Sequence, residues 1–154
     1  MKQLDRIDYR ILQILQQDAK STIKEIAGKL GMTTTPVYER IKRMEEDGYI
    51  KNYVALLNRN LLGLNLVAYC SINLREQSKS AIDSFEADIR NLIEVIECYH
   101  TAGQYDYLIK VVVKDMEDYH RFTTEKLSSI QFIDQIHSSF IMKEVKNSTA
   151  LMLD

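Results

Sequence analysis

The N-terminal third of this 154-residue chain takes its fold from the stretch TIKEIAGKLGMTTTPVYERIKRMEEDG, residues 22–48. Thr22 and Glu25 have the spacing of a capping box, and apolar residues follow at helical spacing. Gly31 can adopt the left-handed conformation that ends a helix. A second helix is predicted to open at the threonines before Pro36, because Thr can cap a helix and Pro fits its first turn. The stretch therefore predicts two short helices joined by three or four residues.

A further helix is predicted ahead of this stretch, over residues 5–17, with Asp5 capping its first turn. Three helices whose last two meet at a short Gly-containing link are typical of a helix-turn-helix, in which the last helix enters the major groove of DNA. Hydroxyls can reach base edges or phosphates, and cations can neutralise phosphates. The residues predicted to face DNA are Thr34, Thr35, Tyr38, Arg40, Lys42 and Arg43. The spacing of Arg40 from Val37 also allows it to turn towards packing, and the pattern as a whole also fits a packing module with solvated charges.

The single domain boundary that the sequence suggests lies in residues 51–65, which are predicted to form a hinge strand and a linker. This segment is apolar for a free linker, so we expect it to pack, against a second subunit. The chain then divides into a helix-turn-helix domain over residues 1–50 and a second domain over residues 66–154.

The second domain is predicted to be α+β with a ferredoxin-like βαββαβ order. Its strands are expected over residues 66–74, 93–102, 105–113 and 132–145, and its helices from Ser78 or Ser80 to 91 and from Asp115 to 127. Gly103 and Gln104 are expected to form a two-residue turn, because Gly supplies a positive φ. Two helices cover one face of such a sheet, and a soluble protein rarely exposes the other apolar face. Homodimerisation is therefore expected.

Composition and charge narrow the class of protein. Residues 1–50 carry nine basic and eight acidic residues, and residues 51–154 carry eleven and fourteen, an asymmetry too weak to prove nucleic-acid binding. Cys70 and Cys98 do not make a disulfide framework, and reduced thiols in the core are expected. The charged N-terminus lacks an apolar signal segment, and no stretch is long enough to span a membrane. A cytoplasmic protein with no membrane association is expected.

Four segments resemble the leucine-responsive regulatory protein/AsnC (Lrp/AsnC, feast/famine) family of transcription regulators. They are LDRID (4–8) with IL (11–12), TPVYERIKRME (35–45) with GYI (48–50), GQYDY (103–107) and MKEVK (142–146). One such motif is a weak signal, but four in order, over nearly the whole chain, are a strong one. The resemblance implies a sequence-preferring regulator that binds double-stranded promoter DNA as a homodimer, often assembled to an octamer.

The same resemblance implies an amino-acid effector, bound between neighbouring dimers and modulating assembly or DNA affinity. The pocket residues that it implies are His100, Thr101, Ala102, Gly103, Gln104, Tyr105, Asp106, Met116, Ser138, Ser139 and Phe140. A zwitterion needs a carboxylate for its ammonium group and N–H donors for its carboxylate. Asp106 can supply the first and the turn around Gly103 the second. Asp106 can equally act as a hairpin-capping acid.

Other functions have little support in the residues. Cys98 and His100 share a strand face, but a metal site needs more ligands than these two, and we expect no metal and no cofactor. Nucleophile-elbow, phosphate-loop and dinucleotide motifs are missing from the sequence, so we expect no enzyme. The alternative is an amino-acid-sensing module whose helical domain contacts protein rather than DNA. DNA binding through several phosphates predicts a steep salt dependence, which separates the two.

Overall fold

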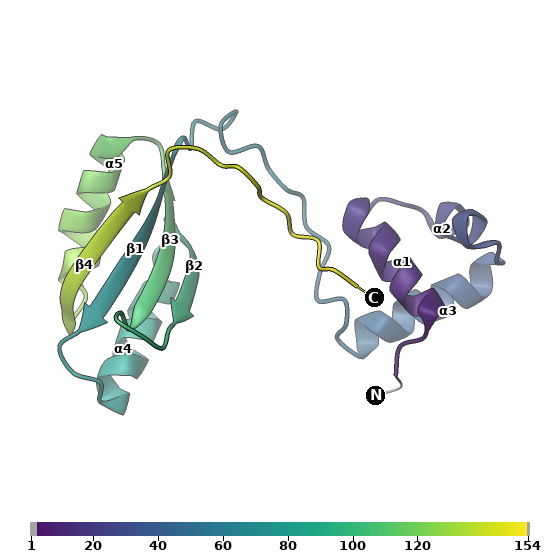
Figure 1. Cartoon of the computed structure of the whole chain (residues 1–154), viewed down its shortest axis with the longest axis horizontal. Helices are drawn as coiled ribbons and strands as arrows, with labels where there is room; N and C mark the ends of the chain where they lie inside the picture. Colours follow the sequence, from purple (N-terminus) through teal and green to yellow (C-terminus); the bar gives the residue numbers. More distant parts are fainter. Residues whose placement is uncertain (1–2, 154) are drawn as a thin grey trace. The chain divides into compact units, whose positions relative to one another are not determined.

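The computed structural model describes residues 3–153 and divides the chain into two units. The helical unit contains the residues up to Leu56 together with the tail that starts at Lys146, and the sheet unit contains Leu57–Val145 (Figure 1). The tail beyond Lys146 therefore groups with the helices, although it follows the last strand in the sequence. Among residues 3–153, no helix combines the length and the apolar character that a membrane span needs.

Three helices form the helical unit: α1 (Arg6–Gln17), α2 (Ile23–Leu30) and α3 (Thr34–Glu46). The predicted cap at Asp5 and the predicted capping box of Thr22 and Glu25 are both present, since the side chains of Asp5 and Thr22 accept hydrogen bonds from the first turns of α1 and α2. Gly31 ends α2 with a φ of 66°, as predicted. The start of α3 differs, because Thr33 occupies the cap position without a capping side-chain hydrogen bond.

The core of the helical unit is a cluster of apolar side chains, one or more from each helix. It consists of Ile11, Ile26, Ala27, Val37, Ile41 and Met44, all buried. These positions are the apolar faces that the periodicity indicated. Burying them fixes which side of α3 is left for solvent.

The predicted hinge strand is wrong for the single chain, because residues 51–57 form no regular element. Strands need a neighbour to accept and donate their backbone hydrogen bonds, and this segment has no such neighbour within residues 3–153. Its apolar side chains are correspondingly open, with Leu56 73% and Leu57 74% exposed.

The sheet unit has the predicted βαββαβ order. Its elements are β1 (Leu66–Leu74), α4 (Lys79–Arg90), β2 (Val95–His100), β3 (Tyr107–Val113), α5 (Met116–Arg121) and β4 (Ile133–Phe140). The strands pair antiparallel in the order β2-β3-β1-β4, so β2 and β4 are the edge strands. Both helices contribute buried side chains to one core, which includes Phe85 of α4 and Tyr119 of α5.

Three element boundaries differ from the prediction. The turn at Gly103 is not a two-residue turn, because β2 ends at His100 and β3 begins at Tyr107. The helix after Asp115 changes to a π turn at Phe122–Lys126 and a 3-10 turn at Leu127–Ser129. The last strand stops at Phe140, although Ile141 still donates a backbone hydrogen bond to Val67 of β1.

Candidate functional site

The exposed side of α3 carries hydroxyls, one aromatic ring and one cation. Thr34, Thr35 and Lys42 are exposed, and Tyr38 is 49% exposed. Lys42 lies 3.9 Å from Glu46, at the limit of an ion pair on a solvated helix face, where such pairs contribute little. These four predicted residues are therefore available to a partner.

Arg40 and Arg43, also predicted to face DNA, are engaged with α1. Arg40 Nη1 lies 2.6 Å from Asp5 Oδ2 and 2.7 Å from Asp8 Oδ1, and Arg43 Nη2 lies 2.6 Å from Asp8 Oδ2. The side chain of Asp8 is only 1% exposed, so its charge depends on these two partners. We call these four residues the carboxylate–arginine cluster. It joins the start of α1 to the middle of α3.

The sequence contained a signal for this cluster that was missed. Asp5 and Asp8 are three residues apart, as are Arg40 and Arg43, so each pair lies on one side of its helix. Matching spacings of opposite charge on two helices indicate an ion-pair network as readily as a DNA contact.

The cluster predicts a loss of stability in acid. The pKa of Asp5 is lowered to about 2, first by the hydrogen bond from the backbone N–H of Asp8 and then by Arg40. Because the folded pKa lies below the ordinary value of 3.8, the stabilisation is complete above pH 4 and is lost as the pH falls towards about 2. Circular dichroism of an acid titration should show Asp5→Asn unfolding with a weaker dependence on pH over this range. Identical acid transitions in the two proteins would contradict the assignment.

The loop between β2 and β3, residues 101–106, holds most of the predicted effector residues. Gly103 has a φ of 147°, the positive value that the prediction required. Thr101 closes the loop, since its N–H donates to the carbonyl of Asp106 at 2.8 Å and its hydroxyl to that of Tyr105 at 2.6 Å. Ala102, Gly103 and Gln104 at the tip are exposed.

Asp106 is bound to the connection between β1 and α4. Its Oδ2 accepts the backbone N–H of Leu74 at 2.8 Å, and its Oδ1 accepts Nε2 of Gln77 at 2.8 Å. Its own N–H donates to the carbonyl of Ile72 at 3.0 Å. These contacts favour the hairpin-capping role that the sequence left open, because the carboxylate holds the loop to the end of β1.

Aromatic contacts flank this loop. His100 stacks on its cross-strand partner Tyr107 at 4.7 Å between ring centroids, and Tyr107 in turn donates to Glu86 of α4 at 3.1 Å. Burial and Glu86 raise the pKa of Tyr107, so its hydroxyl stays protonated. Tyr105 lies 5.3 Å from the ring of His137. The loop is thus fixed at both of its ends.

The other predicted effector residues gather at the end of β4. Tyr119 of α5 donates to Ser138 and packs edge-on against Phe140 at 4.9 Å. Its hydroxyl also lies 3.2 Å from Sγ of Cys70, which confirms Cys70 as a buried thiol, whereas Cys98 is exposed and not a core residue. Ser139 alternates to the opposite side of the strand, and Met116 is 53% exposed at the start of α5.

The two groups of predicted effector residues lie largely apart within one chain, although Tyr105 contacts His137, the residue before Ser138. Phe140 pairs with Ala68 near the start of β1, whereas Tyr107, which follows the loop, pairs with Ile72 near its end. The loop joins the edge strand β2 to the inner strand β3, whereas Phe140 ends the opposite edge strand β4, and Figure 1 shows the β2–β3 loop and the end of β4 at opposite ends of the sheet. We call them the loop half-site (residues 100–106) and the β4 half-site (Met116 with residues 138–140).

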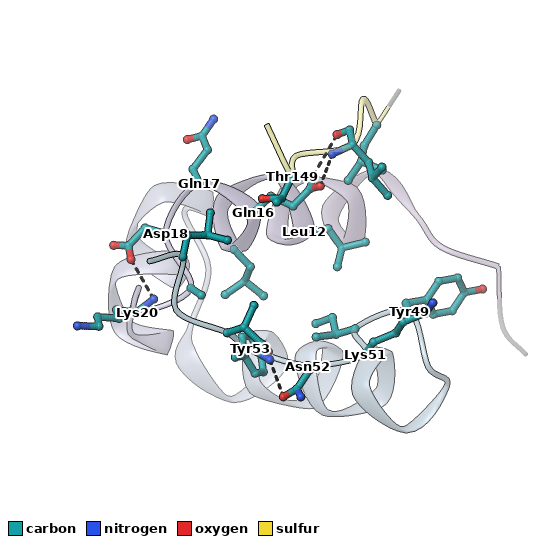
Figure 2. Close-up of a pocket in the computed structure, with 17 residues that line it drawn as sticks. Leu12, Gln16, Gln17, Asp18, Lys20, Tyr49, Lys51, Asn52, Tyr53 and Thr149 are labelled. Carbon is teal, nitrogen blue, oxygen red and sulfur yellow. Dashed lines mark hydrogen bonds between the residues drawn. The ribbon is translucent and has the colours of Figure 1, made fainter. Parts of the chain in front are cut away.

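A hollow of about 690 Å³ in the helical unit was not predicted. The end of α1, the link to α2, residues 49–54 and the tail at Thr149, Leu151 and Leu153 line it; Figure 2 shows Gln16 beside the tail. Tyr53 donates to Glu45 at 2.8 Å, and burial with this contact raises its pKa to about 12. Leucines at every second position near the end of the chain were the available sequence signal. Within residues 3–153, no group of three or more His, Cys, Asp or Glu could hold a metal.

Comparison with known proteins matches both units to models of defined function. Residues 4–51 match a winged helix-turn-helix DNA-binding model, and residues 67–151 match the Lrp/AsnC ligand binding domain. The chain is 35% identical over 152 residues to the leucine-responsive regulatory protein of Salmonella typhimurium, covering 99% of this chain and 93% of the relative. The corresponding protein of Escherichia coli is 34% identical with the same coverage.

Solved structures agree with these matches. A transcriptional regulator from Neisseria meningitidis, solved as an L-Met complex, is 32% identical with a TM-score of 0.95, covering 99% of this chain and 98% of that one. An AsnC family transcriptional regulator from Agrobacterium tumefaciens is 36% identical with a TM-score of 0.92, covering 97% of both chains. The predicted family and fold are therefore confirmed, and the similar proteins are transcription regulators rather than enzymes.

Proposed function

The chain belongs to the Lrp/AsnC family of DNA-binding transcription regulators, and from this premise we propose how its residues divide the work. The exposed side of α3 contacts promoter DNA, and an amino acid binds at the sheet unit to modulate assembly or DNA affinity. The observation that carries the proposal is the order of the two matched domains along a single chain. A protein that binds promoter DNA must share a compartment with that DNA, and we propose that this compartment is the cytoplasm.

At the DNA we assign direct contact to Thr34, Thr35, Tyr38 and Lys42. Lys42 is the exposed cation of α3, since Arg40 and Arg43 already have carboxylate partners at 2.6–2.7 Å. To reach a phosphate, a guanidinium would have to break its ion pair with Asp8, and the buried carboxylate of Asp8 would then lose that partner. The two arginines therefore hold α3 at its angle to α1, and Lys42 neutralises a phosphate.

The test is the salt dependence of DNA binding. Lys42→Ala should weaken binding to all duplex sequences alike and lower the slope of log K against log salt by about 1 for each bound subunit, since each subunit loses one phosphate contact. Fluorescence anisotropy between low and moderate salt measures both quantities. Lys79→Ala is the matched control, because it removes the same charge from α4 in the sheet unit. An unchanged slope for Lys42→Ala, or an equal change for Lys79→Ala, would remove Lys42 from the DNA face.

For the effector we propose a composite site in which one copy supplies the loop half-site and another supplies the β4 half-site. The separation of the two half-sites along β1 supports this, and the neighbour from Neisseria meningitidis solved with L-Met supports an amino acid as the ligand. An amino acid needs N–H donors for its carboxylate, and the exposed tip at Gly103 and Gln104 offers them. Within this site, Asp106 positions the loop.

The proposed assembly is a homodimer that associates further, with eight copies as the size that the family implies. The exposed apolar residues of segment 53–62 support a pairing between copies; they include Val54, Leu56, Leu57 and Leu61. Native mass spectrometry with and without each of the twenty amino acids tests both parts. A monomer under all conditions would contradict the composite site.

A further inference from the structure

The C-terminal tail is hydrogen-bonded to α1 through two glutamine side chains. Gln16 accepts the N–H of Leu151 at Oε1, 2.6 Å away, and donates from Nε2 to the carbonyl of the same residue at 3.2 Å. Gln13 donates from Nε2 to the carbonyl of Leu153 at 3.0 Å. The amide of Gln16 therefore pairs with both backbone groups of one residue, as a neighbouring strand would (Figure 2).

The docked tail has few buried apolar contacts. Leu151 is 73% exposed and Met152 is 91% exposed, although Leu151 also borders the hollow beside α1. Segments held by polar contacts near solvent, with little buried apolar surface, belong to the part of a protein that opens most easily. This tail can therefore dock and release without unfolding the core around Ile11 and Met44.

The same tail is the direct continuation of the β4 half-site. β4 ends at Phe140, whose ring packs on Tyr119, and the N–H of Ile141 donates to the carbonyl of Val67 at 3.0 Å. Residues 142–145 then lead to Lys146, where the helical unit resumes. Four residues span at most about 14 Å when fully extended, so the tether is short.

We infer that this tail is a strap through which the effector site regulates the helix-turn-helix. The inference rests on the proposed function, because it needs an effector at the β4 half-site. An effector that shifts the end of β4 changes the tether, and with it the fraction of molecules whose tail is docked on Gln16. The effector acts by binding more tightly to one of these two states, and DNA must prefer one of them as well.

The experiment compares the full chain with Gln16→Ala, which removes both contacts with Leu151. The matched control is Gln17→Ala, the same change at the next, exposed position of α1. Docking is measured as the rate of tryptic cleavage after Lys146, read by mass spectrometry. Regulation is measured as the change in DNA affinity on adding L-methionine and, separately, each of the other nineteen amino acids.

We expect Gln16→Ala to be cut after Lys146 at least about fivefold faster than wild type, and Gln17→Ala to be cut at the wild-type rate. The most effective amino acid should change the DNA affinity of wild type by about fivefold or more, the usual size of allosteric coupling. In Gln16→Ala the change should fall below about twofold, while calorimetry still detects binding of the amino acid, with an affinity shifted towards that of the undocked state. A chain ending at Lys146 should lose the change in DNA affinity to the same extent as Gln16→Ala.

The two hypotheses fail in different ways. Wild type that responds to none of the twenty amino acids overturns the proposed effector, and the strap with it. Wild type that responds, with Gln16→Ala and the shortened chain responding equally, overturns the strap alone. Unchanged cleavage after Lys146 in Gln16→Ala also overturns it, because the tail then does not dock through Gln16.

Discussion

Replacing Asp8 with alanine should lower the free energy of unfolding of the helical unit by about 3 kcal/mol, the lower end of the loss measured when one partner of a buried ion pair is removed. Asp8 is 1% exposed and serves two guanidiniums, whose side chains are 23% and 29% exposed. After the substitution, Arg40 still forms an ion pair with Asp5, but Arg43 no longer has a carboxylate partner. Nε of Arg43 is already buried without a hydrogen-bond partner in the described part of the chain, so its charge becomes harder to accommodate.

Urea denaturation of the full chain, followed by circular dichroism, measures this loss. Hydrogen exchange of α1 and α3 peptides then assigns it to the helical unit, since two units need not unfold together. Asp5→Ala is the control, because Asp5 is 52% exposed and leaves Asp8 paired with both arginines. Adding Arg43→Met to Asp8→Ala should recover part of the stability, because the unpaired charge is removed. Equal losses for Asp8→Ala and Asp5→Ala would contradict the role of Asp8 as the shared partner.

Local signals in the sequence predicted the helices of this chain well. The cap at Asp5, the box formed by Thr22 and Glu25, and the left-handed Gly31 are all present, because each depends on residues within one or two turns. The partners of Asp8 lie 32 and 35 residues away in the chain. No local pattern fixes which distant cation reaches a buried carboxylate, so Arg40 and Arg43 were assigned to DNA.

In the sheet unit, too, the sequence did not show which segments lack a partner in the single chain or which residues lie far apart in it. β-Branched and aromatic residues, such as Val67 and Tyr69 in β1 and Val111–Val113 in β3, made these strands easy to predict, and the order of elements followed from them. Residues 51–57 have strand-like composition too, yet they lack a partner strand in this chain. The resemblance grouped residues 100–106 with 138–140 as one pocket, whereas the strand register places Tyr107 and Phe140 beside opposite ends of β1.

Asp106→Ala should weaken binding of the effector at least about tenfold, which corresponds to about 1.4 kcal/mol. The carboxylate holds loop 101–106 by accepting from Leu74 and Gln77, and removing it leaves the N–H of Leu74 without its acceptor. A loop that is no longer held must be ordered when the amino acid binds, and that ordering reduces affinity. Calorimetry with L-methionine and the other standard amino acids measures the change, and DNA affinity without effector should stay at the wild-type value.

The conservative variant Asp106→Asn separates positioning from direct contact. Its Oδ1 can still accept from Leu74, and the Gln77 amide can turn to accept from its Nδ2, so the loop stays in place without the negative charge. Affinity within about threefold of wild type is therefore expected if Asp106 acts by positioning. An effector ammonium paired with Asp106 would instead lose a charge-assisted hydrogen bond, and Asp106→Asn would then bind as poorly as Asp106→Ala. That result would return Asp106 to the role of ammonium partner and leave the loop to be held by Thr101.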